Sequence, residues 1–185
     1  MSKHLSVRAL VVVSLLVVAA AAIVGKSAVE FRIRDDCDPA TFNAAIGDGT
    51  CVKAFDGDTT FDEFLEELGE DKEVGAWRFN PDETRVDRGQ GTILASRGGE
   101  FHTFTKVKEF GGGIVGVLNQ IGEFGGTRTE CGQENELTGP SRVNIFVPAG
   151  VSMNGPTGGS ADLPRGKTKW QCCIHPWMRS EITVR

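Results

Sequence analysis

The chain has 185 residues, a length that suits one domain with an extension. Its 39% hydrophobic residues are enough for one core, and its 24 glycines with only 8% aromatic residues favour a turn-rich β protein over a helical bundle. The formal net charge of −5 at pH 7 argues against a nucleic acid as partner.

Residues 1–24 have the pattern of a signal peptide. A basic start with Lys3 and Arg8 precedes the uncharged run Ala9–Val24, which ends in small residues. This run is short for a membrane span, although an uncleaved N-terminal anchor remains an alternative. We therefore expect an exported protein, periplasmic or otherwise extracytoplasmic, whose only membrane contact would be such an anchor.

The chain has five cysteines, and export implies an oxidising compartment in which they can form disulfides. Cys37 and Cys51 flank a loop with turn residues at both ends. We predict a disulfide between them, worth about 3 kcal/mol through the loop that it closes. Cys131 and Cys173 either bridge each other or both stay reduced.

Residues 25–75 are expected to form an N-terminal extension that contains one short helix. Residues 25–58 are rich in turn formers and look irregular. For the helix that follows, Thr59 or Thr60 can cap the start, acidic residues suit the first turn, and Gly69 can end it. Its apolar residues have helical spacing: Phe61, Phe64, Leu65 and Leu68.

The predicted helix lies in a strongly acidic stretch. Nine acidic residues and one lysine lie between Asp56 and Glu73. We favour a solvated helix face, and the alternative is a docking patch for a basic redox partner.

After Gly75 the chain consists of short runs with alternating hydrophobic residues, separated by glycine- and proline-rich turns. The clearest runs are "EFHTFTKV", "RVNIFVPAG" and "EITVR". Because no repeat and no βαβ spacing is visible, we predict an all-β protein, an antiparallel β-sandwich over residues 76–185.

Chemistry-bearing side chains cluster near the C-terminus, in "KWQCCIHPWMRSEITV". Cys172, His175 and Met178 are each three residues apart, and Pro176 argues against a helix, so we expect a tight loop between two strands. Soft sulfur ligands with imidazole select copper, and two histidines, one cysteine and a weak axial methionine make the blue-copper pattern. Outside the targeting segment the only other histidine is His102, which completes this set.

The spacing Cys-x-x-His-x-x-Met in "CCIHPWMRSEITV" resembles the ligand loop of the cupredoxins, in particular the amicyanin and plastocyanin type. The segment "WRFNPDETRVDRGQGTILASRGGEFHTF" resembles the region of that family that carries its first histidine. The resemblance covers residues 76–185 and implies a Greek-key β-sandwich with one mononuclear type 1 copper ion. It also implies Cys172 as the thiolate ligand, His102 and His175 as equatorial ligands and Met178 as the axial ligand.

Two positions depart from the family pattern. Ser96 stands where the family usually has an asparagine that ties the two ligand loops together, which affects the redox potential more than copper binding. Cys173 is a core residue, half of a disulfide or a site open to oxidation. We also expect the ring edge of His175 to reach the surface, with Pro176 and Trp177 beside it as an apolar docking patch.

The function that the resemblance implies is one-electron transfer between redox partner proteins. No open coordination position is expected, so the protein is not predicted to be an enzyme. The alternatives are a copper carrier or storage protein without electron transfer, and a scaffold that stays empty of metal.

Two other kinds of chemistry compete for the same residues. Zinc is the runner-up metal, with Cys172, Cys173, His175 and His102 as ligands, although adjacent cysteines rarely share one tetrahedral ion. Cys172 as a nucleophile with His175 as its base is the other reading, and no third group that would orient the base is evident.

Overall fold

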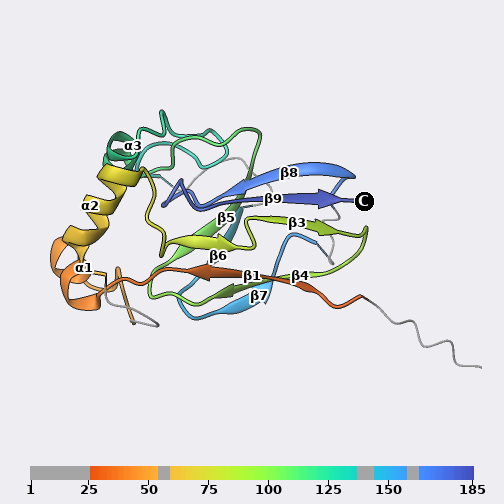
Figure 1. Ribbon diagram of the computed structural model, residues 1–185, viewed down its shortest axis with the longest axis horizontal. Coiled ribbons are helices and arrows are strands. Elements are labelled where there is room, and N and C mark those ends of the chain that lie inside the picture. The colour runs from red at the N-terminus through yellow and green to blue at the C-terminus, as the bar shows by residue number, and fades with distance from the viewer. Residues whose placement is uncertain (1–25, 54–58, 137–143, 158–162) are drawn as a thin grey trace, which may run out of the picture.

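The structure, a computed structural model, describes residues 26–53, 59–136, 144–157 and 163–185. The predicted signal segment lies outside these residues. Within them, nine strands form two sheets that stack as a sandwich, and three helices gather at one end (Figure 1). No helix in this part of the chain is long and apolar enough to cross a membrane. The prediction of a β-sandwich is confirmed.

The first sheet has four strands in the order β2-β1-β4-β7. Their bounds are Val29–Arg34 for β1, Arg78–Asn80 for β2, Thr92–Ser96 for β4 and Ser152–Asn154 for β7. β1 pairs in parallel with β4 and antiparallel with β2, and β4 pairs antiparallel with β7.

β1 lies in a segment that the sequence analysis expected to be irregular, and that expectation is wrong here. Phe31 and Ile33 are fully buried between exposed or half-buried neighbours, which is the alternation of a strand with one face in the core. The expected N-terminal extension therefore contributes an inner strand to the sandwich.

The second sheet has five strands in the order β3-β9-β8-β5-β6. Their bounds are Glu83–Val86 for β3, His102–Val107 for β5, Asn144–Val147 for β6, Gly166–Gln171 for β8 and Arg179–Val184 for β9. The three runs predicted as strands correspond to β5, β6 and β9.

Two pairs of neighbouring strands are parallel, β1 with β4 and β3 with β9. The expectation of a purely antiparallel sandwich is therefore wrong for these pairs. Parallel neighbours need long connections, and a local pattern of alternation carries no information about such distant partners.

The core between the sheets is built around stacked aromatic rings. Phe104 of β5 lies 5.3 Å from Phe31, 5.0 Å from Phe79 and 4.9 Å from Trp170, measured between ring centroids. Phe31 and Phe79 come from the first sheet and the other two rings from the second, so these contacts fix the two layers against each other.

The helices are α1 (Pro39–Ala45), α2 (Phe61–Asp71) and α3 (Gly116–Ile121). The predicted helix is confirmed as α2, and Thr60 forms a capping box with Glu63. The helix does not end at Gly69, because one glycine inside a helix costs only about 1 kcal/mol. Its last residue is Asp71, and the C-cap residue Lys72 has a left-handed backbone.

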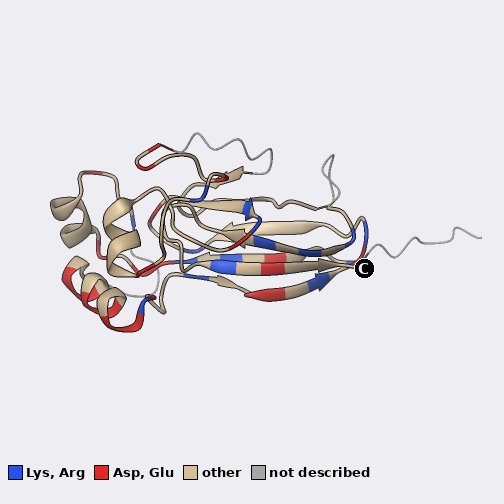
Figure 2. Cartoon of the chain, turned by 90° about the horizontal axis from the view of Figure 1, so that it is seen from above, with Lys and Arg blue, Asp and Glu red and all other residues tan. Residues whose placement is uncertain are grey.

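The helical end of the molecule has its own aromatic cluster. Phe64 of α2 lies 4.9 Å from Trp77, and Phe42 of α1 stacks on the same indole at 5.7 Å. Acidic residues are concentrated in one helix at this end (Figure 2), and that helix is α2. Its described acidic members are exposed or half-buried, which suits both the solvated face and the docking patch, and Asp56 and Asp58 lie outside the described residues.

Two disulfides tie segments that lie far apart in the sequence. Cys37 bridges Cys51, as predicted, and encloses α1. Cys131 bridges Cys173, which was one of two alternatives left open. Cys172 is the free cysteine among the described residues.

Candidate metal centre

The histidines and the free cysteine of the predicted site come from strand β5 and from the loop that joins β8 to β9, all in the second sheet. His102 begins β5, and Cys172 follows the last residue of β8. The loop to β9 is tight, because the amide of Cys172 donates to the carbonyl of Met178 at 3.0 Å and the amide of Met178 donates to the carbonyl of His175 at 2.9 Å. This loop, residues 172–178, is called the ligand loop below.

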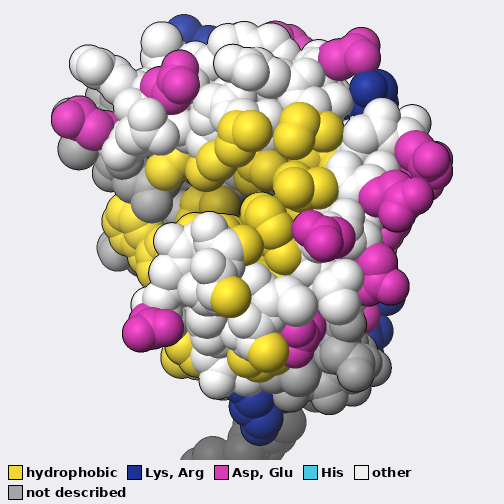
Figure 3. Space-filling model, turned by 90° about the vertical axis from the view of Figure 1, so that its left-hand side faces the viewer, with side chains coloured by type: hydrophobic (Ala, Val, Ile, Leu, Met, Phe, Trp, Pro, Cys, Tyr) yellow, Lys and Arg dark blue, Asp and Glu magenta, His cyan; other side chains and the backbone are white. Residues whose placement is uncertain are grey.

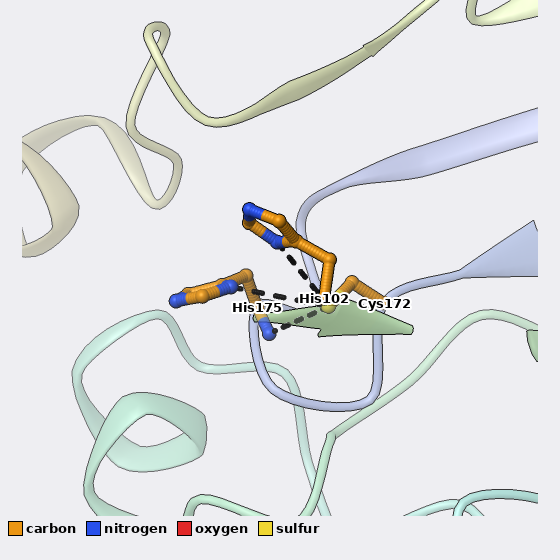
Figure 4. A group of neighbouring side chains, drawn as sticks. All are labelled: His102, Cys172 and His175. Atoms are coloured by element: carbon orange, nitrogen blue, oxygen red, sulfur yellow. Dashed lines mark hydrogen bonds between the residues drawn. The ribbon is translucent and has the colours of Figure 1, made fainter. Parts of the chain in front are cut away.

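The ligand loop brings three of the predicted side chains together. The Nδ1 atoms of His102 and His175 each lie 3.9 Å from Sγ of Cys172 (Figure 4). The possible ligand atoms of these three residues all lie within 4.8 Å of one another. All three side chains are buried, and His175, the most exposed, is only 3% exposed.

Met178, the predicted axial residue, ends the ligand loop and is fully buried. Its place in the same loop is compatible with the predicted role. Its role as a ligand stays a prediction.

The electrostatics of the site favour a thiolate. Burial alone would raise the pKa of the Cys172 thiol, but hydrogen bonds from His102 and His175 and their positive charge bring it well below its usual range. Burial likewise opposes the charge on His102, yet its hydrogen bonds to Asp35 and Cys172 raise its pKa to about 10. In the metal-free protein the two residues are therefore a thiolate and an imidazolium.

Two buried carboxylates face the imidazoles on the side away from Cys172, and neither was predicted from the sequence. Nε2 of His102 lies 2.6 Å from Oδ2 of Asp35, and Nε2 of His175 lies 3.4 Å from Oε2 of Glu100. Glu100 stands two residues before His102, a weak local signal. Asp35 lies 67 positions from His102, so no local pattern could connect them.

A threonine, not Ser96, joins the two ligand segments. Oγ1 of Thr103 accepts a hydrogen bond from the amide of Cys173 at 2.8 Å. The hydroxyl of Ser96 instead accepts from the amide of Gly150 at 3.2 Å. Ser96, which departs from the family's asparagine as expected, thus bonds to the β6–β7 turn and not to the ligand loop.

Residues 113–131 also hold the ligand loop in place, in part through a covalent bond. The Cys131–Cys173 disulfide anchors the loop one residue after the thiolate. The amide of Ile114 donates to the carbonyl of Cys173 at 2.7 Å, and a Cβ at Gly113 would overlap that carbonyl. The ligand loop is thus held at Cys173 twice, by the disulfide at its side chain and by the hydrogen bond to its carbonyl.

His175 does not reach the surface, so the expected exposed ring edge is wrong. The ring of Phe64 lies 6.4 Å from it and that of Trp177 lies 5.4 Å from it, both edge-on. Pro176 and Trp177 are themselves buried, so they form no exposed docking patch. On the helical end of the molecule hydrophobic side chains surround a hollow, and no histidine of the described residues shows there (Figure 3).

The donor set fits copper better than it fits zinc. Two imidazoles and one thiolate, with a methionine in the same loop, suit copper. The zinc set would need Cys173, whose sulfur is bonded to Cys131. A nucleophilic role with His175 as the base does have a carboxylate behind the imidazole, Glu100 at 3.4 Å, but Cys172 is fully buried and His175 nearly so, and a substrate has no access to the sulfur.

A comparison with protein-family models finds no match, and a comparison with curated proteins finds none either. Among solved structures, the chain is similar to a purple cupredoxin from Nitrosopumilus maritimus at 12% identity, with a TM-score of 0.42 over 85% of this chain and 99% of that chain. It is similar to amicyanin from Paracoccus versutus at 11% identity, with a TM-score of 0.35 over 60% of this chain and 76% of that chain.

A copper-containing nitrite reductase from Thermus scotoductus is also similar, at 14% identity with a TM-score of 0.34, over 58% of this chain and 20% of that chain. The sandwich of a four-stranded and a five-stranded sheet carries the His-Cys-His group at one end.

Proposed function

We propose that the chain is an exported type 1 copper protein that carries single electrons between redox partner proteins. The observation that carries this proposal is the convergence of three buried ligand atoms, the Nδ1 atoms of His102 and His175 and Sγ of Cys172, within 4.8 Å of one another. Met178 is proposed as the fourth, axial ligand. One bound copper ion would supply a one-electron couple at this place.

The protein's contribution is to hold the ligands in place before and after the electron moves. Amides of Thr103 and His175 point at Sγ from 3.5 Å, which stabilises the thiolate. The disulfide at Cys173 and the strands on both sides limit how far the loop can move. A site that changes little between oxidation states exchanges electrons with little reorganisation.

Burial argues for electron transfer rather than substrate chemistry. His102 and Cys172 are fully buried and His175 is nearly so, so the site offers a substrate no free approach. Electrons, unlike substrates, can pass through the intervening protein. We therefore propose that the protein is an electron carrier and not an enzyme.

Two disulfides among the described residues support export, because disulfides persist in oxidising compartments. The proposed location is the periplasm or another extracytoplasmic space, and the one membrane contact, if the N-terminal segment stays uncleaved, would be that segment. The partners would be redox proteins, and the acidic surface argues against nucleic acid.

Voltammetry of the copper-loaded protein tests this proposal. We expect one reversible one-electron wave, together with an intense visible band from thiolate to copper, and Cys172→Ser should abolish both. A protein that binds only the reduced ion and shows no wave would instead be a copper carrier. A protein that binds no copper would be an empty scaffold, and the proposal would fail.

A further inference from the structure

Each imidazole of the site has a buried carboxylate behind it. In both rings Nδ1 faces the thiolate, and Nε2 faces an acidic side chain. Asp35 is fully buried and Glu100 is 5% exposed. Buried carboxylates are costly unless they are paired, so two of them beside one small site call for an explanation.

Asp35 is held firmly in position by the segment that leads to His102. Its Oδ1 accepts from the amide of Gly99 at 2.7 Å, and its Oδ2 accepts from the amide of Glu100 at 3.2 Å and from His102 at 2.6 Å. A Cβ at Gly98 would overlap the carboxylate, so the glycine leaves room for it. The sequence "RGGEFH" thus brings two amides and one imidazole to a single carboxylate.

Glu100 is held from a different direction. Its Oε2 accepts a hydrogen bond from Nε1 of Trp77 at 2.5 Å and lies 3.4 Å from Nε2 of His175. Its contact with the imidazole is therefore longer than that of Asp35. The indole that fixes it belongs to the aromatic cluster under α1 and α2.

We propose that Asp35 and Glu100 are positioning residues of the metal site, which fix the orientation of the two imidazoles and lower the reduction potential. This inference rests on the proposed copper site. A partner on Nε2 keeps Nδ1 directed at the metal and makes the imidazole a stronger electron donor. The negative charge of Asp35, buried near the site, also favours the more positive, oxidised metal, since charges interact strongly where water is excluded, whereas burial raises the pKa of Glu100 and weakens its charge.

The two carboxylates are expected to differ in strength. Asp35 makes the shorter contact and is completely shielded from solvent, so its removal should have the larger effect. Glu100 makes the longer contact and shares its oxygen with Trp77. The predicted order of effects on the potential is Asp35→Asn above Glu100→Gln.

The experiment measures the copper(II) affinity, by competition with a chelator, and the reduction potential of both variants at fixed neutral pH. We expect copper(II) affinity to fall by about 10- to 100-fold in Asp35→Asn. The potential should rise by about 59 mV for each tenfold by which copper(II) loses more affinity than copper(I). Glu66→Gln, which removes an exposed charge from α2, is the matched control and should leave both quantities unchanged.

Folded variants with unchanged potentials would overturn the inference, and so would equal losses of affinity for both oxidation states, which a merely structural role predicts. If Asp35→Asn does not fold, Glu100→Gln must still raise the potential for the inference to stand. If the unmodified protein binds no copper, the proposed function itself fails. That result is distinct from the failure of this inference alone, in which the protein binds copper and both variants keep the reduction potential of the unmodified protein.

Discussion

In the metal-free protein, His102 and Cys172 form a buried ion pair whose two pKa values shift in opposite directions. The pKa of His102 rises from 6.5 to about 10, so this residue stabilises the fold fully below pH 6.5, and the effect is lost as pH rises to about 10. The pKa of Cys172 falls well below 9.0, so this residue stabilises the fold fully above pH 9.0, and the effect is lost as pH falls.

The sum of these two effects gives the first prediction. Between about pH 6.5 and 9 the loss from His102 opposes the gain from Cys172, so the pair's contribution to the free energy of unfolding should change less with pH there than the contribution of either residue alone. Denaturant titrations of the metal-free protein over this range measure it. In Cys172→Ser the stabilisation by the thiolate is absent, while Asp35 still raises the pKa of His102. The free energy of unfolding of this variant should therefore fall steadily as pH rises above 6.5. A flat profile in this variant would contradict the assignment of the two pKa shifts to this pair.

Met178 allows a second prediction at this scale. A thioether that acts as a weak axial ligand tunes the potential more than it holds the metal. Met178→Leu should therefore shift the reduction potential and keep the thiolate-to-copper band. Met153→Leu, in β7, is the control and should change neither. Loss of copper uptake in Met178→Leu would show that the axial assignment is wrong.

At the scale of elements, the two disulfides differ in what they hold. Removing Cys131–Cys173 should cost about 4 kcal/mol of unfolding free energy, and removing Cys37–Cys51 about 3 kcal/mol, because the first closes a loop of 42 residues and the second one of 14. The first bridge adjoins the thiolate, so Cys131→Ala with Cys173→Ala should also broaden the copper signal in electron paramagnetic resonance. An unchanged signal would mean that the hydrogen bond from Cys173 to Thr103 suffices to hold the loop.

The helix α2 shields the edge of His175. Phe64→Ala should remove the ring of α2 that lies edge-on to that imidazole, cost about 3–5 kcal/mol of stability and speed the reduction of the copper site by small soluble reductants. Stopped-flow absorption measures the rate. Phe61→Ala is the control, because Phe61 stacks on Phe64 on the same helix and is not one of the described rings beside His175. Equal rates in both variants would mean that electrons enter by another route.

The elements also show how far the sequence predicts this fold. The ligand loop was predictable because its cysteine, histidine and methionine lie within seven residues, and α2 because its cap and apolar face are local. β1 was missed although Phe31 and Ile33 alternate, since turn-forming residues follow directly. α1 was missed as well, although Asp38 and Pro39 mark its start.

At the scale of the whole molecule, the site lies between the end of the sandwich and a helical cap. Asp35 follows β1 of the first sheet, while His102 and Cys172 belong to the second sheet, so the two layers meet at the metal site. The burial of His175 depends on α2, which no pattern around the histidine could indicate. Long-range placement of this kind is what the sequence could not supply.

The central claim is that one copper ion joins His102, Cys172 and His175. Anomalous X-ray diffraction at the copper edge, from crystals of the copper-loaded protein, tests it most directly. We expect a single strong anomalous peak, within bonding distance of Sγ of Cys172 and of Nδ1 of both histidines. A peak elsewhere, or a site that leaves out the imidazole of His102, would contradict it.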